Sequence, residues 1–176
     1  CYLSDKAGTD AIIQGFQDKG TKAAAIQCDV SKLADGQRFV EETAAQLGEI
    51  DILINNAGVE RRANFWAVTE KDYDFVLNVN LKGLFFITQA FVRHQMKAKA
   101  GGKIINISSV HEELPFPHFS TYCASKGGVK MITRDLSIEL APLGITINSI
   151  APGAIETPIN KALLNDPTKL NALLEN

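Results

Sequence analysis

Short, uniformly apolar segments alternate with longer amphipathic ones along this chain, and the alternation constrains its fold more than any other feature. Four apolar segments predict strands: 23–30, 50–55, 103–108 and 145–150. The amphipathic segments predict helices at 8–19, 31–47, from 69 through at least 91, 120–142 and 157–175. Strands that are apolar throughout are typical of parallel sheets buried on both sides. We therefore predict an α/β fold, a doubly wound parallel sheet (Rossmann-like) with helices on both faces.

Local signals mark where several of these helices begin and end. Ser31 is a predicted N-cap, and the segment TEKD at 69–72 resembles a capping box. Gly20 and Gly48 are predicted to end the helices that precede them. These signals place the loops, and any ligand-binding residues in them, between well-defined elements.

Composition indicates one soluble domain, spanning residues 1–176. The chain is 45% hydrophobic with a formal net charge of -2, which favours neither nucleic acid nor an anionic membrane as a partner. No uncharged apolar run approaches the roughly 18 residues that a membrane span needs. Three cysteines without a CxxC pair and three histidines without ligand spacing predict neither a disulfide framework nor a metal site. We expect a cytoplasmic protein.

Polar or glycine-containing segments follow each predicted strand. These segments are Asp29-Val30, Asn55-Asn56-Ala57-Gly58, Ser108-Ser109 and Pro152-Gly153. Open α/β sheets bind ligands beyond the carboxyl ends of their strands, so these four segments are candidates for one cleft. The carboxylate of Asp29 has two interpretations: it accepts from a purine amino group, or it caps the next helix.

Tyr122 and Lys126 lie four residues apart on a predicted helix and therefore share one face. A neighbouring ammonium favours the phenolate form of tyrosine and lowers its pKa. A shift of two to three units requires roughly 3–4 kcal/mol of differential interaction. Gly127 and Gly128 weaken the helix and indicate that another helix or a ligand comes close. The pair is thus predicted to be an acid–base device.

These residues resemble the motifs of the short-chain dehydrogenase/reductase family. The matching positions occur in the family's order and spacing: Asp29-Val30, Asn55-Asn56-Ala57-Gly58, Asn80, Ser109, Tyr122, Lys126, and Pro152-Gly153 with Thr157. The resemblance implies an NAD(P)-dependent enzyme with Tyr122 as general acid/base. It further implies that Lys126 lowers the Tyr122 pKa and binds the nicotinamide ribose. Ser109 would orient the substrate oxygen, and Asn80 would hold a water of the proton relay.

The same resemblance implies how a cofactor would lie. Asp29 and Val30 would flank its adenine, and the cleft would be lined by Asn55, Ala57 and Gly58. The nicotinamide would meet Pro152, Gly153, Ile155 and Thr157. Cofactor choice depends on the segment 1–4, which has no carboxylate at Cys1 and no guanidinium at Leu3. Ser4 or Lys6 would meet a 2′-phosphate, which favours NADP or the use of both cofactors.

Two further segments, SSVHEELPFP (108–117) and PGAIETPIN (152–160), are similar to bacterial glucose 1-dehydrogenases. By this resemblance Glu60 and His111 would contact the hydroxyls of an aldose such as glucose. Two alternatives stay open: a 3-oxoacyl-carrier-protein reductase, and a non-catalytic regulator that binds the cofactor. The family also implies a homo-oligomer, a tetramer or a dimer, formed through its long helices.

One family motif is missing from the sequence. The glycine-rich turn TGxxxGxG that holds the cofactor pyrophosphate is absent, together with the strand before it. In the family's topology that strand would lie between the segment 1–4 and the strand 50–55, so we expect a gap in the sheet there. The family's closing strand is also absent. We therefore expect a fold incomplete at both ends, an interior portion of a longer polypeptide.

Overall fold

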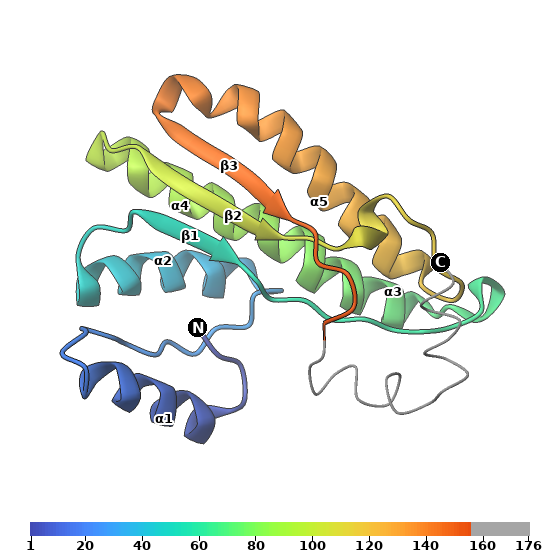
Figure 1. Ribbon diagram of the computed structural model, residues 1–176, viewed down its shortest axis with the longest axis horizontal. Helices are drawn as coiled ribbons and strands as arrows, with labels where there is room; N and C mark the ends of the chain where they lie inside the picture. Colours follow the sequence, from blue (N-terminus) through green and yellow to red (C-terminus); the bar gives the residue numbers. More distant parts are fainter. Residues whose placement is uncertain (156–176) are drawn as a thin grey trace.

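The computed structural model describes residues 1–155, and a three-stranded parallel sheet lies at its centre (Figure 1). The strands are β1 (Ile52–Asn55), β2 (Gly102–Ile107) and β3 (Ile145–Ile150), in the spatial order β1-β2-β3. Three of the predicted strands and their parallel arrangement are therefore confirmed. The predicted helix 157–175 lies outside the described residues.

The helices alternate with the strands as predicted. They are α1 (Lys6–Gln17), α2 (Leu33–Leu47), α3 (Glu70–Leu77), α4 (Leu84–Ala98) and α5 (Ser120–Glu139). Three short 3₁₀ turns connect them: η1 (Phe65–Ala67), η3 (Val110–Glu112) and η4 (Ala141–Leu143). A π-helical turn, η2 (Asn78–Gly83), joins α3 to α4.

The continuous helix Glu70–Ala98 is long and apolar enough to cross a membrane by length and composition alone. Its buried side chains, however, belong to the core. Ile87 and Phe91 of α4 are 5% and 0% exposed and pack in one cluster with Leu53 of β1 and Ile104 of β2. Core helices of soluble proteins pass the same test, and this packing accounts for the apolar character of α4.

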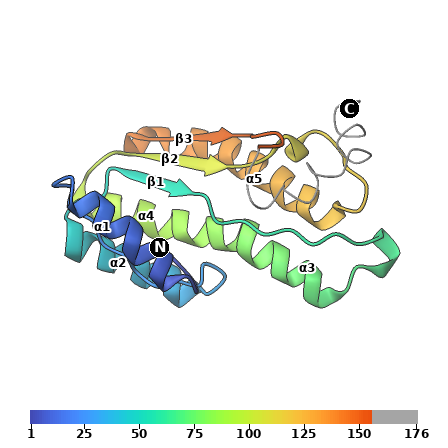
Figure 2. The ribbon, with the colours of Figure 1, turned by 60° about the horizontal axis from the view of Figure 1, so that its bottom comes forward.

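The three strands bury one face against helices. Leu53, Ile104 and Ile147 are at most 7% exposed, and they belong to the cluster that α4 supplies with Ile87 and Phe91. Helix α5 packs against β3, and α2 packs against α4 (Figure 2).

The opposite face of the sheet is open within residues 1–155. Ile52, Ile54 and Ile150 are between 50% and 59% exposed, because successive strand residues point to opposite faces. The prediction that helices cover both faces is thus met on one face of the described part of the chain.

The predicted strand 23–30 is wrong. Within residues 1–155 its regular pairing is one isolated parallel bridge between Tyr2 and Gln27, although Ile26 and Cys28 are buried. The bridge does not pair with β1, and a cavity of about 340 Å³ has Cys1 and residues of β1 in its lining. A strand needs a neighbour along its length, and one bridge leaves most backbone groups of this segment outside any ladder.

The two predicted helix starts differ in outcome. Thr69 is the N-cap of α3, and its Oγ1 accepts from the backbone N–H of Asp72 (3.1 Å), which confirms the cap. The prediction for Ser31 is wrong, because Lys32 occupies the N-cap position of α2. The Ser31 hydroxyl instead donates to Oδ1 of Asp29 (2.7 Å), so it stabilises the turn before the helix.

A row of polar side chains crosses the sheet at the last residue of β1 and one residue before the ends of β2 and β3; the first two are buried and the third is half-buried. Asn55, Asn106 and Ser149 are register partners on β1, β2 and β3, and we call them the polar row. Asn55 Nδ2 donates to Asn106 Oδ1 and to Thr88 Oγ1 (both 2.9 Å). Asn106 Nδ2 donates to Thr133 Oγ1 (2.9 Å), which lies 2.9 Å from Ser149 Oγ. The row therefore ties α4, the sheet and α5 together directly beneath the loops that follow the strands.

Candidate active site

The segments that follow the three parallel strands meet at the carboxyl ends of the strands, which we call the carboxyl edge of the sheet (Figure 1). The backbone N–H of Val110 donates to the Pro152 carbonyl (3.1 Å), so the pairing of β2 with β3 continues into their loops. Predicted site residues of both loops thereby come together: Ser109, Pro152 and Gly153. Ile155, also predicted, is the last described residue and is 56% exposed, and Thr157 lies outside the described residues.

Tyr122 and Lys126 converge on this edge, as their spacing predicts. Both lie in the first half of α5, and Lys126 Nζ is 5.6 Å from the ring centroid of Tyr122. Lys126 as a whole residue is 5% exposed. Its ammonium donates to the carbonyl of Ile107, the last residue of β2 (2.8 Å). The pair thus lies beside Ser109, two residues beyond that carbonyl.

Burial dominates the electrostatics of the pair. It raises the pKa of Tyr122, more than the neighbouring Ser109 hydroxyl lowers it, and the charge of Glu60 raises it further. Burial also lowers the pKa of Lys126, against a smaller opposite effect of Glu112. The Tyr122 pKa is thus raised in this structure, opposite to the expected direction, and the role expected of Lys126 toward it stays a prediction. Both groups lose solvation in their charged forms, and the ammonium is hydrogen-bonded to a backbone carbonyl.

Asn80 lies in the π-helical turn and is 1% exposed. Its Oδ1 accepts from the N–H of Val59 (2.8 Å), and its Nδ2 donates to the Val59 carbonyl (2.9 Å). The second Nδ2 hydrogen goes to Ser125 Oγ (3.1 Å). The side chain therefore clamps the segment after Gly58 to the helices.

The predicted close approach at the paired glycines is confirmed at Gly128. A Cβ on this residue would lie 2.9 Å from Leu81 Cδ1 in the π-helical turn, closer than carbon atoms can pack. Helix α5 can approach the turn that carries Asn80 because Gly128 has no side chain, which leaves room for the side chain of Leu81.

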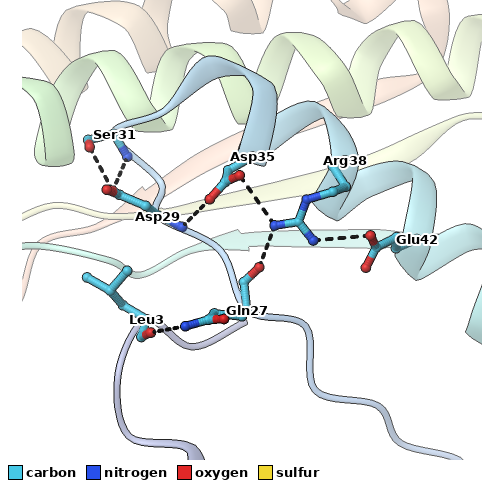
Figure 3. Close-up of polar contacts among 7 residues, drawn as sticks. All are labelled: Leu3, Gln27, Asp29, Ser31, Asp35, Arg38 and Glu42. Atoms are coloured by element: carbon cyan, nitrogen blue, oxygen red, sulfur yellow. Dashed lines mark hydrogen bonds and ion pairs between the residues drawn. The ribbon is translucent and has the colours of Figure 1, made fainter.

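Asp29 lies in a polar network at the start of α2 (Figure 3). Its Oδ1 accepts from both the N–H (3.0 Å) and the hydroxyl of Ser31, which stabilises the turn before the helix. Lys32 is the N-cap residue of α2, so Asp29 does not cap this helix, and its contact with a purine stays a prediction. Asp35 Oδ2 accepts from the Asp29 N–H (2.9 Å), which lowers the pKa of Asp35. Arg38 Nη2 donates to the Gln27 carbonyl (2.7 Å). Two side chains of α2 therefore hold the segment 27–31 in place.

A cavity of about 450 Å³ opens beside this network. Its lining includes four predicted cofactor residues, Asp29, Val30, Ala57 and Gly58, and adds Tyr2, Leu3, Ser31, Val59, Phe75, Asn78 and Val79. The volume lies in the range of about 300–1,000 Å³ that small-molecule sites occupy. The lining is mostly apolar and includes the Asp29 carboxylate and the backbone of Gly58, the residues expected to hold the adenosine half of a dinucleotide. Asn55 lines the 340 Å³ cavity, and its amide nitrogen belongs to the polar row.

The predicted substrate residue His111 lies against the candidate acid–base. Its ring centroid is 6.2 Å from that of Tyr122 and 5.9 Å from that of Phe119, and Nδ1 is 3.0 Å from the Leu114 carbonyl. Arg62 extends this wall, with its guanidinium 4.9 Å from the Phe119 ring. Glu60, the other predicted substrate residue, is close enough to influence the Tyr122 pKa. Both residues thus lie near the reactive group.

Several residues of the site were not predicted: Ser125, Asn106, Thr133, Asp35 and Arg38. A signal existed for Asn106, because it is polar within the apolar segment KIINIS. Ser125 and Thr133 have partners distant in sequence, Asn80 and Asn106, which no local pattern reveals. Among residues 1–155, no group of three metal-ligating side chains is present.

Comparison with known proteins shows the family of this chain. Residues 1–168 match the family model described as short chain dehydrogenase. The chain is 40% identical to 3beta-hydroxysteroid dehydrogenase 1 of Eggerthella lenta, over 94% of this chain and 64% of that protein. It is 36% identical to glucose 1-dehydrogenase 2 of Bacillus subtilis, over 90% of this chain and 62% of that protein.

A solved structure shares the fold. The crystal structure of a gluconate 5-dehydrogenase from Burkholderia cenocepacia, in complex with NADP and tartrate, is 39% identical with a TM-score of 0.87. The similarity covers 94% of this chain and 64% of that one. In all three comparisons the chain spans less than two thirds of the relative's length.

Proposed function

Because this chain belongs to the short-chain dehydrogenase family, we propose that it carries the catalytic residues of an NAD(P)-dependent oxidoreductase acting on hydroxyl groups. The observation that carries the proposal is the convergence of Tyr122 and Lys126 beside Ser109, at the sheet edge that also borders a cofactor-sized cavity. When bound, the nicotinamide accepts or supplies the hydride.

The protein's own groups have separate roles in this proposal. The Tyr122 hydroxyl takes the proton of the substrate hydroxyl during oxidation and returns it during reduction. The Ser109 hydroxyl, which influences the pKa of Tyr122, orients the substrate oxygen. Lys126 and Asn80 border Gly58: a Cβ there would lie 3.8 Å from Lys126 Nζ and 3.7 Å from Asn80 Oδ1. Lys126 would therefore meet a cofactor that lies over Gly58, and Asn80 fixes the backbone beneath it.

For the substrate, we propose a secondary or hemiacetal hydroxyl, most plainly that of an aldose such as glucose. His111 supports this choice, because Nδ1 faces the Leu114 carbonyl and leaves Nε2 to bond a hydroxyl near Tyr122. The names of the relatives include a steroid dehydrogenase as well as a glucose dehydrogenase, so family membership alone does not select a sugar.

The second candidate is a 3-oxoacyl-carrier-protein reductase with the same catalytic residues. A basic patch for the carrier's phosphopantetheine would favour it, and Arg61 and Arg62 are the candidates. Arg61 lies 3.6 Å from Asp72 and 4.4 Å from the Phe75 ring, so much of its charge is already paired. A non-catalytic regulator is disfavoured because Tyr122 and Lys126 are both in place.

For the cofactor, we propose NADP or the use of both NADP and NAD. Ser4 and Lys6 lie one and three residues after Leu3, which lines the 450 Å³ cavity. Lys6 is paired with Asp10 in this structure, so it would have to exchange partners to meet a 2′-phosphate. The exposed position of this ion pair makes the exchange inexpensive.

The test is a panel of substrates offered to the full-length protein with each cofactor. Turnover is measured from the change in nicotinamide absorbance. We expect oxidation of aldoses, and kcat/KM for oxidation should rise about tenfold per pH unit below the Tyr122 pKa. The sign follows from the role of Tyr122: oxidation needs its deprotonated form, and burial raises its pKa. Reduction needs the protonated form and should stay level over the same range. No turnover with sugars, β-keto thioesters or steroids under either cofactor would contradict the proposed function.

We further propose that the protein forms a homo-oligomer. Phe85 of α4 and Met131 and Ile138 of α5 are 40%, 62% and 78% exposed, which supports pairing of these helices between subunits. Sedimentation velocity should give a dimer or tetramer, and Ile138→Glu should shift it toward the monomer. A monomer at micromolar concentration would contradict this proposal.

A further inference from the structure

Ser125 lies between the two residues of the candidate acid–base pair but points away from solvent. It is 0% exposed, and its hydroxyl has two partners. The Oγ donates to the carbonyl of Tyr122 (2.7 Å) and accepts from Nδ2 of Asn80 (3.1 Å). Buried hydroxyls are costly unless they are hydrogen-bonded, and this one uses both its donor and its acceptor.

Asn80 extends this contact to the backbone on the other side of the cleft. Its amide pairs with both backbone groups of Val59, at 2.8 and 2.9 Å, in the manner of a neighbouring strand. Both Nδ2 hydrogens are used, one for Val59 and one for Ser125. A continuous chain of hydrogen bonds therefore runs from the Tyr122 carbonyl through Ser125 and Asn80 to Val59.

We propose that Ser125 is a positioning residue, whose hydroxyl holds the turn of α5 that carries Tyr122 and Lys126 at a fixed separation from the cleft segment Gly58-Val59. The inference rests on the proposed function. Lys126 Nζ and Asn80 Oδ1 lie 3.8 and 3.7 Å from the position that a Cβ on Gly58 would occupy. A shift of Asn80 relative to α5 therefore changes where Lys126 stands over this backbone. Small misplacements of a reactive group reduce catalysis strongly.

The alternative explanation is that Ser125 simply bonds a carbonyl of its own helix. Helix α5 contains a matched example. Ser137 Oγ donates to the Arg134 carbonyl (2.7 Å), with the same three-residue separation, but it is exposed and has no contact with Asn80. Ser137→Ala therefore measures the loss of the helical hydroxyl bond alone, and Ser125→Ala measures that loss together with the link to Asn80.

The first measurement is amide hydrogen exchange at Val59 in the full-length protein, which does not depend on activity. We expect Ser125→Ala to speed exchange of this N–H roughly fivefold, the equivalent of one hydrogen bond. Ser137→Ala should leave it unchanged. Equal exchange rates at Val59 in both variants would overturn the inference, because Asn80 would then hold Val59 without help from Ser125.

The second measurement is steady-state kinetics against pH. Ser125→Ala should lower kcat by about tenfold and shift the alkaline limb of its pH profile, whereas Ser137→Ala should change neither. Loss of folded protein would reduce the apparent kcat without moving the pH profile, so the profile separates positioning from stability. An unchanged profile together with unchanged kcat would also overturn the inference. Failure of the wild-type protein to turn over any substrate contradicts the proposed function instead, and Val59 exchange then decides whether the link exists.

Discussion

Tyr122→Phe is expected to lower kcat by about 10²–10⁴-fold, the range typical of losing a positioned general acid–base group. The substitution removes only the hydroxyl. The ring keeps its edge contacts with His111 and Phe119, at 6.2 and 5.9 Å between centroids, so the aromatic wall should remain intact. Lys126 keeps its bond to the Ile107 carbonyl, which involves no atom of Tyr122.

The measurement is kcat for both reaction directions, together with the dissociation constant of the reduced cofactor from fluorescence titration. Cofactor affinity should change little, because the hydroxyl acts on the substrate proton. Tyr73→Phe is the matched control, since Tyr73 is 49% exposed on α3 and should retain full activity. A Tyr122→Phe enzyme that turns over within tenfold of wild type would show that another group carries the proton.

The order of elements could be predicted from the sequence because each depends on a local period. Helix α5 and strand β3 agree with the predicted ranges 120–142 and 145–150 to within a few residues. The segment 23–30 shows where this reasoning ends. Ile26 and Cys28 are buried as a strand pattern requires, but strand formation also depends on a partner, and a local pattern carries no information about partners.

The site was predictable as a set of residues and not as a set of interactions. Tyr122 and Lys126 share a helix face by geometry alone, so their convergence follows from spacing. The direction of the Tyr122 pKa shift does not, because it depends on how much solvent each group loses. Asn80 gives the same contrast: its place on the long helix was predictable, whereas its clamp on Val59 joins residues 21 positions apart.

Asn106→Asp is expected to destabilise the fold by about 3–5 kcal/mol at neutral pH, the cost of an uncompensated buried charge. Asn106 is 0% exposed at the centre of the polar row. The new carboxylate would still accept from Asn55 Nδ2, but it has no hydrogen to donate to Thr133. Thr133 already directs its own hydroxyl to the Val129 carbonyl (2.8 Å), so the carboxylate would face an oxygen.

The pH dependence of this variant has a definite sign. Burial raises the pKa of a carboxyl group above its unfolded value of about 3.9, so the folded variant binds more protons than the unfolded chain. Its stability should therefore increase as pH falls from 7 toward 5, and the deficit against wild type should shrink. Urea unfolding at several pH values measures both effects.

Asn148→Asp is the matched control for this experiment. Asn148 lies on β3, directly before Ser149 of the polar row, and its side chain is exposed on the opposite face of the sheet. The free energy of unfolding of the Asn148→Asp variant should stay within about 0.5 kcal/mol of wild type at every pH. Equal losses in the two variants would mean that the polar row is hydrated, and the row could not then fix α5 against the sheet. A pH-dependent loss confined to Asn106→Asp would identify the row as the dry support that holds the helix of Tyr122 over the ends of the strands.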